Sequence, residues 1–258
     1  MLAALAPVPA TAYTAADAFW TTDGAEPAPS GLEPTFKGTY AKTITERLGI
    51  EIEDGVVKVP TATGFMNVDL QLKYEAIQSQ THEFIFSVLL DQEIGGTGNK
   101  RVTGSSHGAT QPGFGNGFGD VPVDFQRPLA VTGFAGYAFG EGSRPNALNA
   151  GFSVQYSIPY LVSKVTDADL PPLLRALTPI VEVVLSQPSA TRDGKFRTLT
   201  IAPGFSYTQG NGREFAVEAL FPATKNIGHA VGVFGQLTLQ LDYLLPDSIL
   251  GRPLFAGR

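Results

Sequence analysis

The chain has 258 residues, no cysteine, 29 glycines and a formal net charge of −6, and only 16% of its residues are charged. The lack of cysteine excludes a disulfide framework and a thiolate metal site, and an acidic chain without a basic cluster disfavours nucleic acid as a partner. No apolar run reaches the roughly 18 residues of a membrane helix, which still leaves a membrane barrel, because barrel strands are only half apolar.

The first 33 residues show little periodic pattern. Ala10-Thr11-Ala12 follows a small, apolar stretch and fits the A-x-A cleavage pattern of an export signal, but the basic region that starts such a signal is missing. Two interpretations stay open for residues 1–12: the remnant of an export signal, or an alanine- and proline-rich leader. Residues 13–33 are predicted to form an extension with a weak strand near Phe19.

From Thr35 onward, apolar and polar residues alternate as in β-strands, whose successive side chains point to opposite faces. Short connections join consecutive segments, which favours an antiparallel meander. One helix-like interlude is predicted at 162–175, limited by Pro171-Pro172. The alternating segments are 35–44, 50–53, 66–75, 84–93, 113–120, 129–139, 149–160, 177–186, 198–207, 214–221 and 229–245.

Segment 229–245 shows the alternation most clearly. Its odd positions are mainly aliphatic and lead to Tyr243, while its even positions include carboxamide, hydroxyl and carboxylate groups. In a soluble barrel or sandwich the apolar face would form the core. In a membrane barrel the apolar face would meet lipid and the polar face would line the lumen. The direction of these side chains therefore distinguishes the two folds.

Three features favour the membrane barrel. Several segments are as long as the roughly 9–11 residues of a tilted membrane strand, whereas strands in soluble proteins average about 5–6 residues. Aromatic residues such as Tyr74, Tyr137 and Phe221 lie near the ends of the apolar faces, as in the belts at a lipid–water interface. The chain also carries fewer charges than the roughly 25% expected of a soluble domain.

We therefore predict an all-β fold, an antiparallel up-and-down transmembrane β-barrel of about twelve strands, or alternatively about ten. It occupies residues 34–245, and a C-terminal tail follows at 246–258. The predicted lumen-lining polar residues are Asp69, Gln71, Lys73, Glu75, Glu83, Asp91, Gln155, Glu182, Glu214, Glu218, Gln236, Gln240 and Asp242. The predicted lipid-facing residues are Leu70, Leu72, Val154, Val217, Leu237, Leu239 and Leu241.

The sequence contains no convincing catalytic or metal-binding motif. The stretch 104–108 matches G-x-S-x-G, but it lies in a glycine-rich loop and lacks the preceding strand and following helix of a nucleophile elbow. His82, His107 and His229 are scattered and show no metal-ligand spacing. We predict that the protein is not an enzyme and has neither a cofactor nor a metal site.

Several short segments resemble a family of proteobacterial proteins expected to be outer-membrane β-barrels, related to the family associated with the meta-cleavage pathway of phenol degradation. The matching segments are 83–84, 93–98, 117–120, 127–133, 156–161, 177–182, 246–248 and 251–255. The resemblance implies a location in the outer membrane of a Gram-negative cell and passage of small, including aromatic, compounds. It carries over no catalytic residue.

Three functions are compatible with these observations. The first is a narrow channel or uptake porin, whose acidic lumen would favour cations or polar solutes and whose partners are outer-membrane lipid and small solutes. The second is a filled, non-conducting barrel with a structural role and a protein partner in an envelope complex. The third is a soluble barrel that binds lipids or aromatic compounds, in which Leu237, Leu239 and Leu241 would point to a common interior.

Overall fold

The computed structural model describes most of the chain from Thr35 to Phe255. The described residues are 35–45, 47–59, 61–79, 84–103, 109–118, 127–140, 145–166, 168–188, 197–209, 212–225, 231–252 and 254–255. The export-signal remnant, the weak strand near Phe19, and Glu83 lie outside them. The protein is mostly β, and its strands pair antiparallel.

The strands correspond to the alternating segments of the sequence, except that β2 is eight residues longer than the predicted segment 50–53 and the short β3 is added at the end of β2. They are β1 (Thr35–Thr43), β2 (Leu48–Val59), β3 (Ala62–Phe65), β4 (Val68–Ser79), β5 (Phe84–Ile94), β6 (Ala109–Phe118), β7 (Leu129–Gly140), β8 (Ala147–Tyr156), β9 (Leu177–Pro188), β10 (Thr198–Gln209), β11 (Arg213–Pro222) and β12 (Gly232–Leu239).

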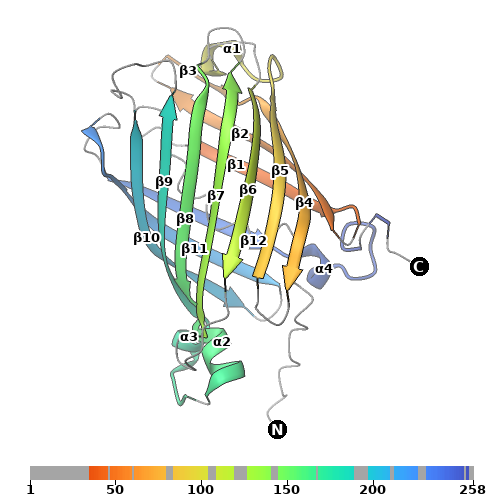
Figure 1. The fold of residues 1–258 in the computed structure, drawn as a ribbon, viewed down its shortest axis with the longest axis vertical. Helices are drawn as coiled ribbons and strands as arrows, with labels where there is room; N and C mark the ends of the chain where they lie inside the picture. Colours follow the sequence, from red (N-terminus) through yellow and green to blue (C-terminus); the bar gives the residue numbers. More distant parts are fainter. Residues whose placement is uncertain are drawn as a thin grey trace.

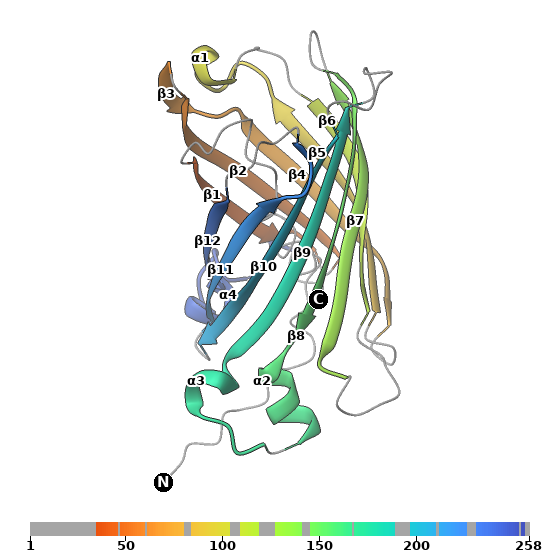
Figure 2. The same cartoon turned by 90° about the vertical axis from the view of Figure 1, so that its left-hand side faces the viewer.

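Each strand pairs with its neighbour along the chain, in the order β1-β2-β4-β5-β6-β7-β8-β9-β10-β11-β12, while β3 pairs with the end of β2. This order confirms the predicted antiparallel meander. The sheet curls until β12 returns to the side of the molecule that carries β1 (Figures 1 and 2). A register shift at Glu75/Ile77 in β4 interrupts the otherwise regular pairing with β5.

Short helices lie at both ends of the sheet (Figure 1). Helix α1 (Lys100–Thr103) lies with β3 at one end, and α2 (Ile158–Tyr160), a π-helical turn (Leu161–Val165) and α3 (Pro172–Arg175) lie at the other. The predicted helix-like interlude is thus confirmed. Ser157 caps α2, and Pro172 starts α3, where a missing N–H costs nothing.

The predicted last strand, 229–245, is wrong at its C-terminal end. Strand β12 stops at Leu239, and Leu241–Leu244 forms helix α4. The amide of Gln240 donates to the Gly212 carbonyl at 2.8 Å, which holds the start of α4 against the β10–β11 turn. Gly212 has a φ of +75°, and a Cβ there would lie 2.6 Å from Cβ of Tyr243, so this close approach requires glycine.

The segment after α4 returns to the first strand. The amides of Leu254 and Phe255 donate to the carbonyls of Thr43 and Ile44 at 3.2 and 2.9 Å. The Lys42 ammonium donates to the carbonyls of Ile249 at 2.6 Å and Leu250 at 2.9 Å, and also to that of Arg252. We call residues 241–255 the C-terminal clasp, because they link the end of β12 to the end of β1.

Candidate functional site

The strands bury mostly polar side chains on one face and expose apolar side chains on the other. The buried residues on one face, which we call the inner face, are mostly polar. They are Glu51, Lys73, Glu75, Ser87, Thr132, Ser153, Thr178, Glu182, Thr200, Ser206 and Glu218. The opposite, outer face carries exposed aliphatic and aromatic side chains on every strand whose side chains are described. An ordinary soluble domain buries its apolar side chains and exposes its charges.

On the N-terminal wall, which we define as β1, β2, β4 and β5, inner-face charges lie beside opposite charges and hydrogen-bond donors. Lys37 forms an ion pair with Glu53 at 2.9 Å, and the Thr39 hydroxyl donates to the same carboxylate at 3.3 Å. Lys73 lies close enough to Glu51 to interact with it electrostatically. These contacts offset part of the cost of burying ionised groups.

Near one end of this wall, Asn67, just before β4, connects the sheet to the loop that follows β5. Its side-chain amide donates to Glu93 at 2.6 Å, and its side-chain oxygen accepts the Gly98 amide at 3.0 Å. A Cβ on Gly98 would lie 2.4 Å from the Met66 carbonyl oxygen. Glycine at 98 therefore lets the loop pack directly on the backbone before β4.

On the C-terminal wall, which we define as β7–β12, hydroxyl groups and small residues surround the inner-face acids. The hydroxyls of Thr132 and Ser153 are 2.6 Å apart, and Ser153 lies opposite Glu182, whose side chain is fully buried. Glu218 lies opposite Gly204. A Cβ on Gly204 would lie 2.5 Å from Cγ of Glu218, so the missing side chain makes room for the carboxylate.

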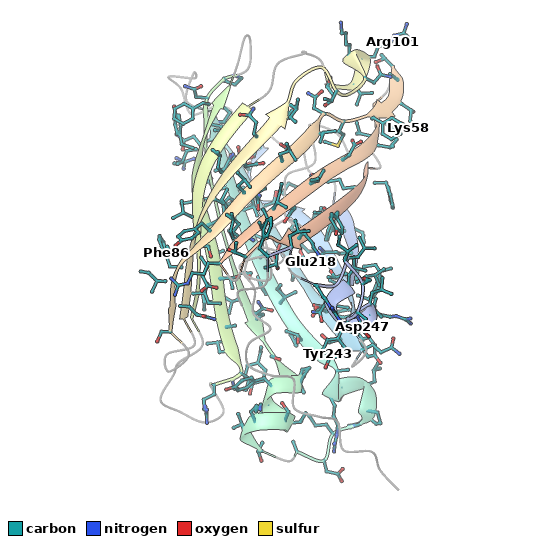
Figure 3. All side chains as sticks on the ribbon, turned by 90° about the vertical axis from the view of Figure 1, so that its right-hand side faces the viewer. Lys58, Phe86, Arg101, Glu218, Tyr243 and Asp247 are labelled. Carbon is teal, nitrogen blue, oxygen red and sulfur yellow. The ribbon has the colours of Figure 1, made fainter. Side chains whose placement is uncertain are left out.

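Two buried polar oxygens on the inner face have no hydrogen-bond partner among the described residues: Ser87 Oγ and Glu218 Oε2. Ser87 is on β5 and Glu218 is on β11. Figure 3 shows Glu218 about midway between the ends of the sheet. An unsatisfied buried oxygen is costly, and bound water or a polar solute would lower that cost.

The structure places most of the predicted lumen residues on the inner face. Lys73, Glu75, Glu182 and Glu218 are buried, and Asp69, Gln71, Asp91, Gln155, Glu214 and Gln236 are partly buried there. Gln240 is exposed and Asp242 belongs to α4, so neither is a strand residue as predicted. The inner-face acids Glu51, Glu53 and Glu93 were missed, although the alternation at 50–53 and 84–93 identifies them.

The predicted lipid-facing residues lie on the outer face, with one exception. Leu237 and Leu239 are 64% and 48% exposed, Leu72 and Val154 are also exposed, and Leu70 and Val217 are partly exposed. Leu241 is the exception, because it lies in α4. Phe86, on β5, also projects from the outer side (Figure 3).

Sequence alternation did not identify the apolar residues of the inner face. Val57, Leu89, Ile180, Val184 and Ala202 are buried there, and Val184 packs with Ala202. The continuous run from Ile180 to Leu185, interrupted only by Glu182, was the available signal, since an unbroken apolar run places apolar residues on both faces. The inner face is therefore mixed, with aliphatic side chains between the polar ones.

The described residues contain neither a metal-binding cluster nor a membrane-spanning helix. No group of three or more histidine and acidic side chains there is arranged to hold a metal ion. No described helix has the length and apolar character to cross a bilayer. No known family model matches the chain, and no curated protein matches it either. The family resemblance seen in the sequence stays a prediction.

Proposed function

We propose that the protein is an outer-membrane β-barrel that acts as a narrow channel or uptake porin for small solutes. The reversed burial of the two faces carries this proposal. Leucine, valine and phenylalanine side chains surround the sheet on its outer face, while glutamate and lysine are buried on its inner face. Lipid offers the outer side chains an apolar solvent, and in the proposed barrel the sheet closes so that no unpaired strand edge faces the lipid.

The connections support an orientation in that membrane. Three of the five connections at the end that carries α2 and α3 are short, namely those between β1 and β2, between β4 and β5, and between β10 and β11. The connections between β6 and β7 and between β8 and β9 are the longer ones at that end. The connections at 95–108, 189–197 and 223–231 lie at the end that carries α1 and are longer. Outer-membrane barrels have short periplasmic turns and longer external loops. We therefore assign the α1 end to the external side.

The inner face supports a preference for cations. Its acids outnumber its bases. The bases are Lys37 and Lys73, and the acids are Glu51, Glu53, Asp69, Glu75, Asp91, Glu93, Glu182, Glu214 and Glu218. Rings of acidic side chains favour cations in channels. The buried Val57, Leu89, Ile180 and Val184 on the same face favour a narrow passage over a wide one.

The channel is tested by cysteine substitution, because the natural chain contains no cysteine. Gln71 lies on the inner face of β4 and Leu72 beside it on the outer face. In planar bilayers, a charged, water-soluble thiol reagent should reduce the conductance of Gln71→Cys and leave that of Leu72→Cys unchanged. The unsubstituted protein is the second control. A protein that stays soluble and monomeric without detergent would contradict the proposal.

A non-conducting barrel in an envelope complex is the alternative, and one observation favours it. The inner face contains the aliphatic group Val184 and Ala202, packed against Leu220, which belongs to a filled interior. This alternative predicts silent bilayers and a co-purifying protein partner. A soluble barrel that binds lipids or aromatic compounds requires the opposite burial, with Leu237 and Leu239 inside, and we do not propose it.

A further inference from the structure

The outer face changes from apolar to cationic towards the end of the β2–β3 hairpin. Phe65 lies opposite Val56, and two pairs further towards the end Thr63 lies opposite Lys58. These residues share the outer face, because they alternate with the buried Gly55 and Val57. Phe65 is 61% exposed and Lys58 is exposed as well. An aromatic ring thus lies immediately on the membrane side of a lysine.

Helix α1 adds two more cations beside this hairpin. The Asn99 amide donates to the Phe65 carbonyl at 2.9 Å, and a Cβ on Gly64 would lie 2.5 Å from the Asn99 side-chain nitrogen. These contacts fix the start of α1 directly on β3. Lys100 and Arg101 follow Asn99, and both side chains are exposed. Figure 3 shows Lys58 and Arg101 at the same end of the molecule.

We call Lys58, Phe65, Lys100 and Arg101 the hairpin patch. Across the described ranges of the chain, none of its three cations forms an ion pair. This differs from Lys37, Arg175 and Arg252, which each pair with an acid. The patch therefore combines uncompensated positive charge with an exposed ring, in the order in which a lipid presents phosphate and hydrocarbon.

We propose that the hairpin patch binds the phosphate-bearing headgroup of an anionic lipid in the external leaflet. This inference rests on the membrane location proposed above and concerns a different surface from the channel. Lysine and arginine form charge-assisted hydrogen bonds to phosphate oxygens. Phe65 packs against the adjoining acyl chain, as aromatic side chains do at the membrane interface. The bound lipid fixes the height of the α1 end relative to the bilayer.

The test measures lipid binding to the full chain in neutral detergent. Phosphatidylglycerol is titrated into the purified protein, bound lipid is counted by native mass spectrometry, and zwitterionic phosphatidylcholine is the reference lipid. The patch variant is Lys58→Gln/Lys100→Gln/Arg101→Gln. The matched control, Lys164→Gln/Lys225→Gln/Arg213→Gln, removes three other exposed cations. Resistance of each variant to urea establishes that it is folded.

The patch variant should bind phosphatidylglycerol roughly a hundredfold more weakly, because it loses three basic residues and each contributes on the order of 1 kcal/mol near an anionic lipid surface. The control variant should bind like the natural protein. Equal binding by all three proteins would overturn the proposal. Displacement of bound phosphatidylglycerol by inorganic phosphate at millimolar concentration would also overturn it, because the site would then take free phosphate.

A second measurement serves if the triple variant fails to fold. Lys100→Gln/Arg101→Gln changes α1 alone and leaves every strand intact, and it should lose part of the preference for phosphatidylglycerol. High salt should remove the preference in the natural protein, because exposed charges are screened. A preference unchanged by salt contradicts the inference. The channel measurement is independent, so conductance without lipid preference would defeat this inference alone, whereas solubility without detergent would defeat the proposed function.

Discussion

The N-terminal and C-terminal walls of the sheet hold buried charge in different ways. On the N-terminal wall, Lys37 and Lys73 lie beside the carboxylates of Glu53 and Glu51. On the C-terminal wall, the inner-face charges are Glu182, Glu214 and Glu218, and hydroxyl groups and glycine surround them. Both walls have the same apolar outer face, so the difference concerns the inner face alone.

This contrast shows that a buried charge acquires its energetic role from its neighbours. Removing one member of a buried pair leaves the other uncompensated, which is strongly destabilising. Removing a buried charge with an unsatisfied oxygen, as at Glu218, lifts a desolvation cost instead. The two walls should therefore respond in opposite directions to the loss of a charge.

The largest effect is expected from Lys73→Met on the N-terminal wall. The substitution leaves the buried Glu51 carboxylate without its nearby cation, and should lower the free energy of unfolding by about 3–5 kcal/mol. Urea unfolding in lipid vesicles measures this. Lys164→Met removes an exposed lysine from the π-helical turn after α2 and is the matched control. Adding Glu51→Gln to Lys73→Met should recover part of the loss, and failure to do so would contradict the pairing.

The outer face should not distinguish the two walls. If the proposed membrane location holds, arginine in place of Leu72 on β4 or Val181 on β9 puts a charge into mid-bilayer lipid, and each should cost about 2–4 kcal/mol. Leu239→Arg should cost only about 1 kcal/mol or less, because Leu239 ends β12 and lies near the interface. Urea unfolding in vesicles of one lipid compares the three. Equal costs at all three positions would argue against the proposed membrane depth.

A smaller effect of opposite sign is expected from Glu218→Gln on the C-terminal wall. One oxygen of this buried carboxylate has no hydrogen-bond partner among the described residues. An uncharged amide of similar shape should raise the free energy of unfolding by on the order of 1 kcal/mol. Glu53→Gln is the contrasting variant, because it weakens the pair with Lys37 and should destabilise the protein. The same sign for both variants would remove the distinction between the walls.

The smallest effect is expected at the C-terminal clasp, which links the end of β12 on one wall to the end of β1 on the other. Lys42→Met removes three hydrogen bonds to carbonyl groups, but the site is open to solvent. The free energy of unfolding should fall by only about 0.5 kcal/mol. Hydrogen exchange at the Leu254 and Phe255 amides should accelerate, while exchange in the middle of β9 stays unchanged. Equal acceleration in β9 would indicate a global rather than a local effect.

The strands and their faces could be predicted because an amphipathic strand repeats every two residues. At Leu70, Leu72 and Tyr74 the apolar side of that repeat is unmistakable, and the structure places all three on the outer face. Ile180 and Val184 were missed because the alternation was taken as strict. Their burial depends on what packs opposite them, which a single strand does not reveal.

The end of β12 and the C-terminal clasp could not be predicted for a different reason. Leu241 to Leu244 fits either a strand or a helix, and the contact of Gln240 with the Gly212 turn accompanies the helix. Lys42 meets the Ile249 carbonyl across 207 residues of sequence. Local periodicity contains no information about a pairing at that separation.

The clasp also bears on the order in which the sheet forms. Neighbouring strands pair through local hairpins, which form quickly because little chain has to be closed. The contact between Lys42 and residues 249–252 joins the two ends of that series, and it must close a loop of more than 200 residues. Until it forms, the edges of β1 and β12 lack this tie. That interval is when the growing sheet is most exposed to pairing with a second chain.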